Sequence, residues 1–362
     1  MKNVAVLGAG KIGSLISWLL AHSGDYHVHV GDMLPETLQH LERELEHPSI
    51  QVHSLDIMDR SSLVQLLRAI QVDAVISALP FYCNRQVAEV AGELNIHYFD
   101  LTEDVEVAWA VRKISEKAPA AFVPQCGLAP GFISIVASDL MRRFVELDTV
   151  KLRVGALPAR PSNALKYALT WSTNGLINQY ANPCQAIENG LPVSLPPLEG
   201  YETVELDGSP YEAFNTSGGL GTLAETYAGR VKKMNYKTLR YPGHCEKMRF
   251  LMNDLELRRD RETLARILEN AVPRTLQDVV LLYVSVTGKR DGGFFEGSFV
   301  RRVYPQKIGG ILWSAIQVTT ASSACAVVDL VLQGKAPARG FVTQECIRLD
   351  SFLENRFGLY YR

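Results

Sequence analysis

Residues 1–15, MKNVAVLGAGKIGSL, decide the fold of this chain. An apolar run at 4–7, typical of a strand, leads directly into Gly8, Gly10 and Gly13, and a helical pattern follows. In a dinucleotide-binding turn with these parts, the N–H groups of the helix N-terminus face a pyrophosphate. The first glycine permits the tight turn, the second lets the backbone approach the phosphates, and the third lets the helix lie close to the strand. We therefore predict a dinucleotide-binding turn formed by Gly8, Gly10, Lys11, Ile12 and Gly13.

An acid also stands where the adenosine ribose of a dinucleotide would bind. Asp32 closes the second predicted strand, about 20 residues after Gly13, which is the usual place of the carboxylate that accepts hydrogen bonds from the ribose. This carboxylate would repel a 2′-phosphate, and Gly31, Met33 and Leu34 offer no arginine to bind one. We therefore expect NAD rather than NADP as the cofactor.

Two further strand ends are candidates for cofactor contacts. Asp56 and Ile57 follow the third predicted strand and are placed to flank the adenine, although an ordinary strand end is an equal alternative. Ala78, Leu79 and Pro80 follow the fourth strand, at the carboxyl edge where open parallel sheets bind ligands. We expect these three residues near the nicotinamide ribose.

Strand-like and helical patterns alternate up to about residue 125. The predicted strands are 4–7, 27–30, 51–55, 74–77, 98–101 and 121–124, and the predicted helices are 12–21, 36–46, 61–70, 84–94 and 105–118. This alternation predicts an α/β fold, with a doubly wound parallel sheet of the Rossmann type over residues 1–125.

The pattern changes after GLAPG (127–131). Longer strand-like runs follow at 151–158, 236–241, 279–288 and 297–305, with KRDGG (289–293) as a hairpin turn. We predict an α+β mixed-sheet domain over 126–309, in which the proline-rich residues 191–197 form a loop. A final segment, 310–362, begins with an apolar helix over 310–332 and is expected to pack back on the Rossmann domain.

Composition excludes several classes of function. The chain has 362 residues, 47% of them hydrophobic, and a formal charge of −2 without a block of like charge, so we expect neither nucleic acid nor a membrane surface as a partner. Its six cysteines are scattered without a C-x-x-C pair, which argues against a metal site or a disulfide framework and favours the cytoplasm. The predicted first strand leaves no room for a signal peptide. The apolar stretch 308–332 contains Gln317 and Asp329, so we predict a buried helix rather than a membrane span.

Polar residues of the second domain gather in three short stretches. These are LTWSTNG (169–175), FNTSGG (214–219) and KTLRYPGH (237–244). Each combines aromatic groups, hydroxyls or a cation with glycine, which is typical of segments that close around a small polar molecule.

These stretches, together with GLAPG and NPCQAIENG (182–190) behind GAGKIG, resemble the saccharopine dehydrogenase superfamily, and within it the L-lysine 6-dehydrogenase branch. The resemblance covers nearly the whole chain. It implies a Rossmann domain, a mixed-sheet domain that binds substrate and forms a homodimer, and NAD-dependent oxidation at a carbon that bears nitrogen. Saccharopine reductases carry a lysine just after the tyrosine that matches Tyr167, whereas this chain has Ala168, which weakens saccharopine itself as the substrate.

The implied reaction moves a hydride from the ε-carbon of L-lysine to NAD. Water then hydrolyses the imine to ammonia and the semialdehyde, which cyclises to piperideine-6-carboxylate. Arg240 is our candidate for binding the α-carboxylate, because a guanidinium offers a planar two-donor fork that matches it. Thr216, Ser217 and Tyr241 are expected to add hydrogen bonds. Trp171 is expected to line the pocket, with core packing as the alternative.

The reaction also needs a base to take the proton of the amine. His244 is one candidate, because the free pKa of histidine lies near 6.5. The acids Asp100, Glu103 and Asp104, at the carboxyl end of the fifth predicted strand, are the other candidates. The sequence leaves this choice open.

Three other functions stay open at this stage. A protein of the same family that acts on saccharopine or carboxynorspermidine would oxidise a secondary amine with the same fold. Sugar and inositol dehydrogenases share the two-domain plan but carry a lysine followed by proline where this chain has Asp100, Leu101 and Thr102. A non-catalytic NAD-binding regulator would keep the fold without the chemistry.

Overall fold

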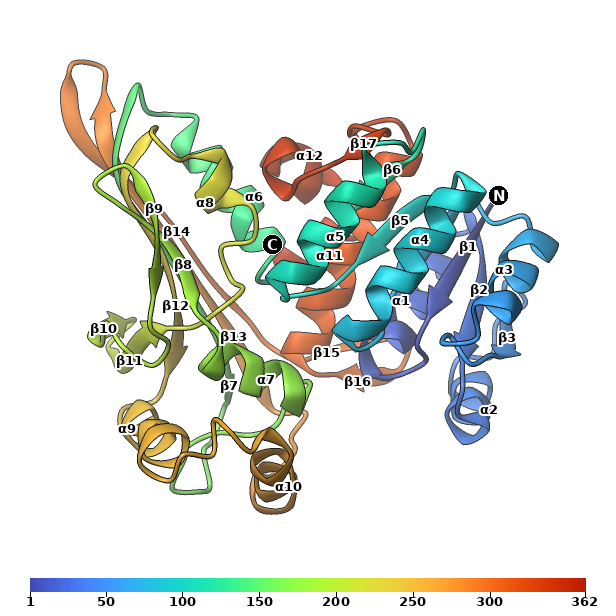
Figure 1. The fold of residues 1–362 in the computed structure, drawn as a ribbon, viewed down its shortest axis with the longest axis horizontal. Coiled ribbons are helices and arrows are strands. Elements are labelled where there is room, and N and C mark those ends of the chain that lie inside the picture. Colours follow the sequence, from blue (N-terminus) through green and yellow to red (C-terminus); the bar gives the residue numbers. More distant parts are fainter. The chain divides into compact units, whose positions relative to one another are not determined.

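The computed structural model describes all residues from Met1 to Arg362 (Figure 1). The chain divides into two compact units. Unit 1 consists of Met1–Phe132 and Thr319–Arg362, and unit 2 is Ile133–Val318. The chain therefore leaves the first unit just after GLAPG, and it returns to that unit inside the long apolar helix rather than at residue 310.

A seven-stranded parallel sheet forms the centre of unit 1. Its order is β17-β6-β5-β4-β1-β2-β3. The strands are β1 (Lys2–Leu7), β2 (Tyr26–Asp32), β3 (Ile50–Ser54), β4 (Ala74–Ser77), β5 (His97–Asp100), β6 (Ala121–Val123) and β17 (Gly340–Phe341). The order 3-2-1-4-5-6, extended by β17 from the C-terminal segment, is that of the doubly wound dinucleotide fold. The predicted α/β class is confirmed.

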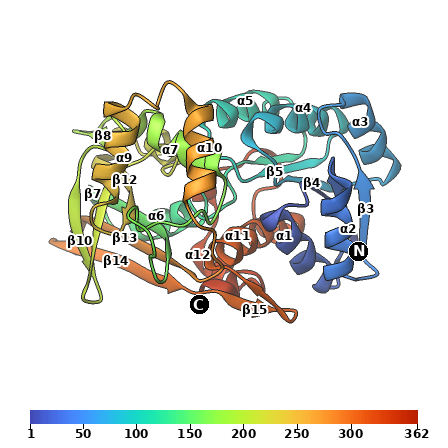
Figure 2. The same ribbon diagram turned by 90° about the horizontal axis from the view of Figure 1, so that it is seen from below.

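Helices cover both faces of this sheet, and its strands are therefore almost continuously apolar. Figure 2 shows α3 (Arg60–Ala69), α4 (Asn84–Leu94) and α5 (Val105–Ser115) side by side on one face. These three helices pack on a core that includes Ala5 and Leu7 of β1. The other face carries α1 (Lys11–His22) and α2 (Pro35–Glu44).

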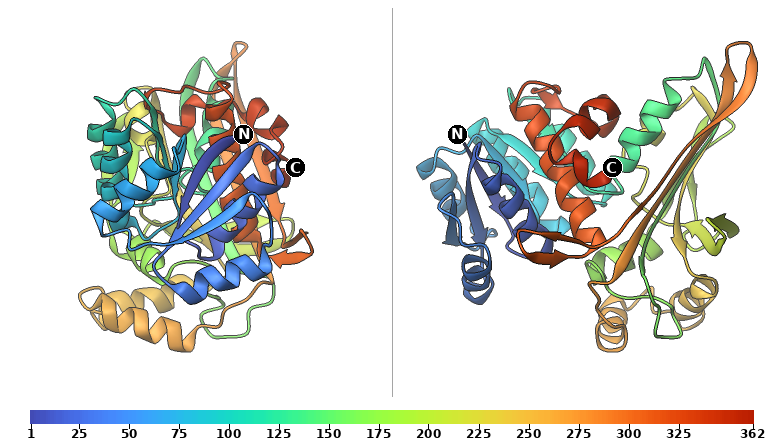
Figure 3. Two further views of the ribbon diagram at one scale, coloured as in Figure 1. Left: turned by 90° about the vertical axis from the view of Figure 1, so that its right-hand side faces the viewer. Right: turned by 180° about the vertical axis from the view of Figure 1, so that it is seen from behind.

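Unit 2 is built on a mixed sheet whose main path is β10-β11-β12-β7-β13-β14. Only the β12–β7 pair on this path is parallel. The strands are β7 (Glu146–Pro158), β8 (Cys184–Glu188), β9 (Leu191–Leu195), β10 (Glu202–Leu206), β11 (Ser209–Asn215), β12 (Val231–Arg240), β13 (Asp278–Arg290) and β14 (Gly293–Val303). KRDGG forms the predicted hairpin, because Arg290 pairs with Gly293 across the turn (Figure 3). The helices of the unit include α6 (Phe132–Met141), α7 (Thr173–Ala181), α9 (His244–Arg249) and α10 (Arg261–Ala271).

The predicted helix over 310–332 is wrong in its first residues. A small hairpin, β15 (Gln306–Ile308) and β16 (Ile311–Trp313), comes first, and α11 begins only at Ala315. Gly309 and Gly310 take the positive φ angles that the hairpin turn requires. Ser314 and Gln317 then form reciprocal side-chain to backbone hydrogen bonds of 2.9 and 3.3 Å. This capping box fixes the start of the helix.

The proline-rich residues 191–197 are not a loop throughout. β9 spans Leu191–Leu195 and pairs antiparallel with β8. Asn189 and Gly190 connect the two strands with φ angles of 51° and 83°. An Asn-Gly pair suits a tight hairpin turn because both residues tolerate positive φ. Pro192 is the one proline inside β9, and it is tolerated there because the strand pairs on one side only.

Helix α11 (Ala315–Leu332) is long and apolar enough to cross a membrane, but 94% of it is buried inside the protein. This burial is typical of a core helix. Its Asp329 accepts a hydrogen bond of 2.5 Å from the hydroxyl of Tyr26, and the thiol of Cys325 lies 3.8 Å from the carbonyl oxygen of Ile16. The last part of the chain is thus integrated into unit 1.

Candidate functional site

The glycine turn after β1 has the geometry of a phosphate cradle. Gly8 has a φ of 101°, and a Cβ atom there would lie 2.7 Å from the carbonyl oxygen of Ala78. A Cβ on Gly13 would lie 1.8 Å from the carbonyl oxygen of Gly8, so both positions exclude a side chain. At Gly10 a Cβ would meet nothing within 4 Å. The backbone is therefore open at the residue where a pyrophosphate must approach, and Lys11 and Ile12 follow as the first residues of α1.

Asp32, at the end of β2, is tied to this turn. One carboxylate oxygen accepts a 2.8 Å hydrogen bond from the N–H of Ala9, and the other accepts a 2.9 Å bond from the N–H of Leu34. The carboxylate is thus fixed beside the glycines with lone pairs left to accept ribose hydroxyls. In dinucleotide folds a carboxylate at this position lies near the adenosine ribose.

The two other segments that we predict to contact the cofactor, 56–57 and 78–80, have different surroundings. The end of β4 adjoins the glycine turn, because the N–H of Ala78 donates to the carbonyl of Leu7 at 2.8 Å and Leu79 lies beside Gly8. Pro80 follows, at the start of a short 3-10 turn (Phe81–Cys83). The side chain of Ile57, in contrast, belongs to the hydrophobic core.

Asp56 and Ile57 are therefore better explained as an ordinary strand end. Asp56 accepts a hydrogen bond from the N–H of Met58 at 2.9 Å, as in a turn. The carbonyl of Ile57 accepts from the side chain of Gln86. The expected contact of this strand end with adenine therefore stays a prediction.

Of the three acids at and just after the end of β5, Asp100 and Asp104 make hydrogen bonds that hold the backbone around them. Asp100 is fully buried and accepts hydrogen bonds from the hydroxyl of Tyr98 and from the N–H groups of Thr102 and Gln125. Burial raises the pKa of this carboxyl, and its bonds join the loops that follow β5 and β6. Asp104 caps the N-terminus of α5 through the N–H of Val107.

Glu103 differs from both neighbours. Burial raises its pKa to about 7, and the charges of Asp104 and Asp100 act in the same direction. Its carboxylate accepts no hydrogen bond from another residue. It lies at the carboxyl edge of the sheet, the edge at which folds of this type bind their ligands. A half-buried acid with a pKa near neutrality at such an edge has the properties of a general base.

In unit 2, Arg240 ends β12 with only 2% of its surface exposed. Its Nε donates to the hydroxyl of Tyr180 at 2.9 Å, and its Nη1 donates to Thr238 Oγ1 and to the carbonyl of Leu239, both at 2.8 Å. The guanidinium also lies 4.9 Å from the centre of the Tyr167 ring. All of these partners are neutral, no carboxylate lies within 4 Å, and Nη2 makes no hydrogen bond within the protein.

His244 belongs to the same network as a neutral imidazole. Its Nδ1 lies 2.8 Å from the carbonyl of Leu165, and since a carbonyl only accepts, the ring proton is on Nδ1. Nε2 therefore accepts from the hydroxyl of Tyr180 at 3.0 Å. Burial, together with the charge of Arg240, lowers the pKa of His244 to about 3. These bonds and this lowered pKa make His244 a weak candidate for the base, and they hold its ring against the hydroxyl of Tyr180.

The TSGG loop packs against the same face of β12. A Cβ on Gly219 would lie 2.3 Å from the ring of Tyr236, which stands four residues before Arg240 on the strand. The hydroxyl of Thr216 is buried without a hydrogen-bond partner. Ser217 is bonded through its N–H to the carbonyl of Gln179 on α7. The loop thus brings the predicted hydroxyls to the strand that carries Arg240.

Trp171 and Tyr241 have different surroundings. The indole N–H of Trp171 donates to the hydroxyl of Tyr167 at 3.2 Å, so Trp171 is part of the aromatic cluster beneath Arg240. The hydroxyl of Tyr241 donates to the carbonyl of Pro158, and its ring packs near Tyr211 in a separate core cluster. The structure therefore separates Tyr241 from the group that surrounds Arg240.

Sequence reasoning missed the two aromatic residues that hold Arg240 in place. Tyr180 comes from α7, and Tyr167 from the segment before that helix. Tyr167 stands within the segment that carries the family resemblance, but Tyr180 gives no local signal. It is separated from Arg240 by 60 residues, and only the packing of α7 on the sheet brings them together.

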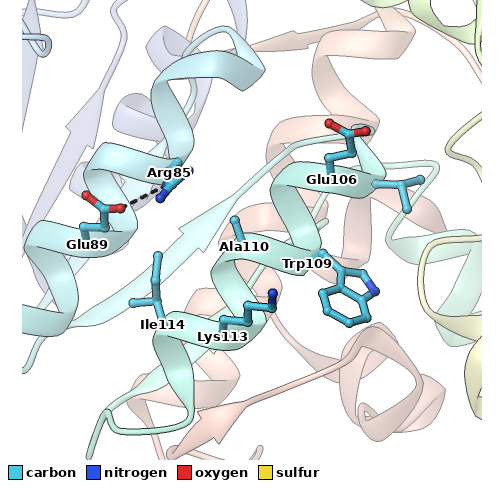
Figure 4. A pocket seen from close by; sticks show the side chains of 8 residues that line it. Arg85, Glu89, Glu106, Trp109, Ala110, Lys113 and Ile114 are labelled. Atoms are coloured by element: carbon cyan, nitrogen blue, oxygen red, sulfur yellow. Dashed lines mark hydrogen bonds and ion pairs between the residues drawn. The ribbon is translucent and has the colours of Figure 1, made fainter.

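A surface groove of about 470 Å³ runs between α4 and α5 (Figure 4). Its lining includes Trp109, Lys113 and the ion pair between Arg85 and Glu89. None of the predicted site residues lines it. The groove is therefore a feature of the outer helical surface of unit 1 and not part of the candidate site.

Two family models match this chain. The model of the saccharopine dehydrogenase NADP binding domain matches residues 4–123, and the model of the saccharopine dehydrogenase C-terminal domain matches residues 127–355. Together they cover almost the whole chain and support a nicotinamide cofactor. The first description names NADP, so the preference for NAD that we inferred from Asp32 stays a prediction.

Curated relatives include mitochondrial alpha-aminoadipic semialdehyde synthase of Rattus norvegicus, 22% identical over 304 residues, or 79% of this chain and 31% of the relative. The mouse protein of the same name is 25% identical over 225 residues, which are 58% of this chain and 24% of the relative. Carboxynorspermidine synthase of Vibrio alginolyticus is 24% identical over 172 residues, or 40% of this chain and 41% of the relative. The chain thus spans about a quarter to a third of the semialdehyde synthases.

A solved structure shares the fold over nearly its whole length. The apo form of saccharopine dehydrogenase (L-Glu forming) from Saccharomyces cerevisiae superposes with a TM-score of 0.77 at 18% sequence identity. The match covers 97% of this chain and 95% of that one. The predicted combination of a Rossmann sheet and a mixed-sheet domain is therefore found in a known protein.

Proposed function

Because the chain belongs to the saccharopine dehydrogenase family, we propose that it is a nicotinamide-dependent dehydrogenase that oxidises an amino acid at a carbon bearing nitrogen. The observation that carries this proposal is the guanidinium of Arg240, which is buried with neutral partners only. A buried charge without a counterion costs several kcal/mol. A substrate carboxylate would supply the missing charge and bind Nη2.

The glycine turn of unit 1 fits a nicotinamide dinucleotide. The open backbone at Gly10 and the N-terminus of α1 suit the pyrophosphate, and Asp32 suits the ribose hydroxyls of NAD. When bound, the nicotinamide ring accepts the hydride that the substrate carbon loses. The protein supplies the remaining requirements, which are anchoring of the substrate and removal of a proton.

Glu103 is our candidate for the proton acceptor. With a pKa of about 7 it is largely ionised at mildly alkaline pH, and a base whose pKa lies near the working pH is suited to accept a proton in the reaction. Asp100 already accepts three hydrogen bonds within the protein, and both ring nitrogens of His244 are engaged. This distribution of partners favours Glu103 over the other candidates.

We propose L-lysine as the substrate, oxidised at the ε-carbon with release of ammonia. Lysine carries one carboxylate, and among the buried cations of unit 2 only Arg240 lacks an acidic partner, since Arg153 and Lys237 both bind Glu202. Saccharopine carries three carboxylates, and the position where saccharopine reductases have a lysine holds the buried Ala168. A secondary amine such as carboxynorspermidine is the second candidate, because one of the relatives is named for its synthesis.

The test is NADH formation on mixing the protein with NAD and L-lysine at mildly alkaline pH. Saccharopine, ornithine and carboxynorspermidine are assayed in parallel, and NADP serves as the cofactor control. Turnover with lysine, lost in R240Q, supports the proposal. Turnover only with a secondary amine would support the proposed reaction class but assign a substrate other than lysine. NADH binding without turnover of any amine favours the non-catalytic regulator.

A further inference from the structure

Unit 2 buries two carboxylates, Glu212 on β11 and Asp278 on β13, and neither forms an ion pair with a cation. A buried carboxylate is costly unless hydrogen bonds replace its hydration. Asp278 accepts hydrogen bonds from the N–H groups of Ala315 and Ile316, the first two residues of α11. Asp278 is thus a helix cap, which leaves Glu212 as the buried acid whose role is open.

Glu212 holds the turn that carries His244. One of its oxygens accepts a 2.7 Å hydrogen bond from the N–H of Gly243, and the other accepts a 2.5 Å bond from the N–H of Cys245. His244 lies between these two residues and is the first residue of α9. The carboxylate therefore fixes the backbone on both sides of the histidine.

The strand register also places Glu212 beside Arg240. β11 and β12 are antiparallel, and Glu212 is the residue directly opposite Arg240. Side chains at directly opposite positions project from the same face of a sheet, with Cβ atoms about 5 Å apart. An acid at this position is well placed to form an ion pair with the arginine. Both oxygens of Glu212 are instead bonded to the turn, so Arg240 has no acidic partner.

These contacts form a closed ring of four buried side chains. Arg240 is bonded to the hydroxyl of Tyr180, and Tyr180 is bonded to Nε2 of His244. The backbone on either side of His244 is bonded to Glu212, which stands opposite Arg240 on the neighbouring strand. A displacement of the turn 243–245 would therefore move the ring of His244, and with it the hydroxyl that orients the guanidinium.

We propose that Glu212 is a positioning residue of the substrate site and acts on Arg240 in two ways. It holds His244 and Tyr180 in the arrangement that orients the guanidinium. Because its own oxygens are bonded to backbone N–H groups, it also leaves Arg240 to bind a substrate carboxylate. This inference rests on the proposed function, in which Arg240 anchors that carboxylate. Glu212 thus affects substrate binding without touching the substrate.

The first test compares E212Q with D278N in steady-state kinetics. E212Q keeps the size of the side chain but replaces one acceptor oxygen by an NH2 group, which cannot accept a bond from an N–H group. We expect KM for the amine to rise by about tenfold, the effect of one lost hydrogen bond, with kcat and NADH affinity nearly unchanged. D278N makes the same chemical change at the other buried carboxylate. It should lower the melting temperature without changing KM.

A double-mutant cycle shows whether Glu212 acts through Tyr180. E212Q and Y180F should each raise KM, but in E212Q/Y180F the two increases should not multiply, because the second change affects a network that the first has already broken. E212D, which keeps the charge on a shorter side chain, replaces E212Q if that variant does not fold. Independent effects that multiply, or an unchanged KM in E212Q, would overturn the proposal.

A second measurement does not depend on turnover. In protein with isotope-labelled histidine, the imidazole nitrogen NMR signals of His244 are assigned by their absence from H244Q. They report the single tautomer that its two hydrogen bonds select. We expect these signals to shift in E212Q and to stay unchanged in D278N, and unchanged signals in E212Q would overturn the proposal. If the protein oxidises no amine, the proposed function fails, but these signals still show whether Glu212 holds His244.

Discussion

The hydroxyl of Tyr180 connects Arg240 to His244, with 2.9 Å to the Nε of the arginine and 3.0 Å to the Nε2 of the histidine. All three side chains are buried. Because Nδ1 of His244 donates to a backbone carbonyl, each bond in this chain has only one possible direction. The network fixes the guanidinium through Nε and leaves Nη2 without a partner in the protein.

The first prediction concerns Arg240. R240Q removes the charge that we propose binds the substrate carboxylate, and we expect kcat/KM to fall by about a hundredfold or more, mainly through KM. R240K keeps the charge without the planar fork and should lose less. Steady-state kinetics measures both, with circular dichroism as the control for folding. Equal kinetics of R240Q and the unchanged protein would exclude Arg240 as the anchor.

The second prediction separates a positioning role of His244 from a catalytic one. H244Q keeps an acceptor for the Tyr180 hydroxyl, whereas H244F does not, so we expect KM to rise more in H244F than in H244Q. Y180F should raise KM similarly, by about tenfold, because it frees the Nε of Arg240. In all three variants the pH dependence of kcat should keep its shape. Loss of a pH limb in H244Q would instead show that the histidine takes part in proton transfer.

The third prediction concerns Glu103 and pH. If Glu103 accepts the proton, kcat/KM should rise with pH through an apparent pKa near 7, and E103Q should lower kcat by about a hundredfold and abolish this limb. A pH series of initial rates checks this. The same limb in E103Q would assign it to another group.

Glu103 should also affect stability in a defined direction. Its folded-state pKa lies above the ordinary value of 4.5, so the folded protein binds more protons than the unfolded chain between about pH 4.5 and 7. The contribution of this carboxyl to stability is therefore present below pH 4.5 and is lost as the pH rises through 7. We expect E103Q to raise the melting temperature relative to the unchanged protein at pH 8 but not at pH 4. Thermal melts at the two pH values test the sign.

The fourth prediction distinguishes the two kinds of glycine in the turn. G10A adds a methyl group that meets nothing in the protein, so the melting temperature should change little while NADH affinity falls, because the methyl group takes space needed by the pyrophosphate. G13A places a methyl group against the carbonyl of Gly8 and should lower stability by several kcal/mol. Fluorescence titration with NADH and thermal melts measure the two effects. A stable G10A variant with unchanged NADH affinity would contradict the proposed cradle.

The fifth prediction concerns the choice between NAD and NADP. D32N keeps an acceptor oxygen but removes the negative charge, so the preference for NAD should weaken, with kcat/KM for NADP rising relative to that for NAD. The ratio of the two kcat/KM values is the measurement. A protein that already prefers NADP would refute our interpretation of Asp32.

The first half of the fold could be predicted almost to the residue. The predicted segments 74–77 and 84–94 coincide with β4 and α4. Parallel strands buried on both faces are continuous apolar runs, and their helices have a distinct period, so local sequence is sufficient there. We did not predict the hairpin before α11, although Ser314 and Gln317 form a capping box that marks the start of the helix. We also did not predict the strand β9, although the Asn189-Gly190 pair before it is typical of a hairpin turn.

The sequence by itself determined the parallel sheet, the glycine turn with Asp32, and Arg240 as a cation among polar and aromatic residues, because these depend on short-range patterns. Only the tertiary structure decided the roles of the titrating groups. A pKa depends on burial and on partners that are distant in sequence, such as Tyr180 for His244 and the carboxyl-edge loops for Glu103. The sequence left His244 and the acids near the end of β5 as equal candidates for the base, and we propose Glu103 for this reason. The structure also places Arg240 as a buried cation without an acidic partner.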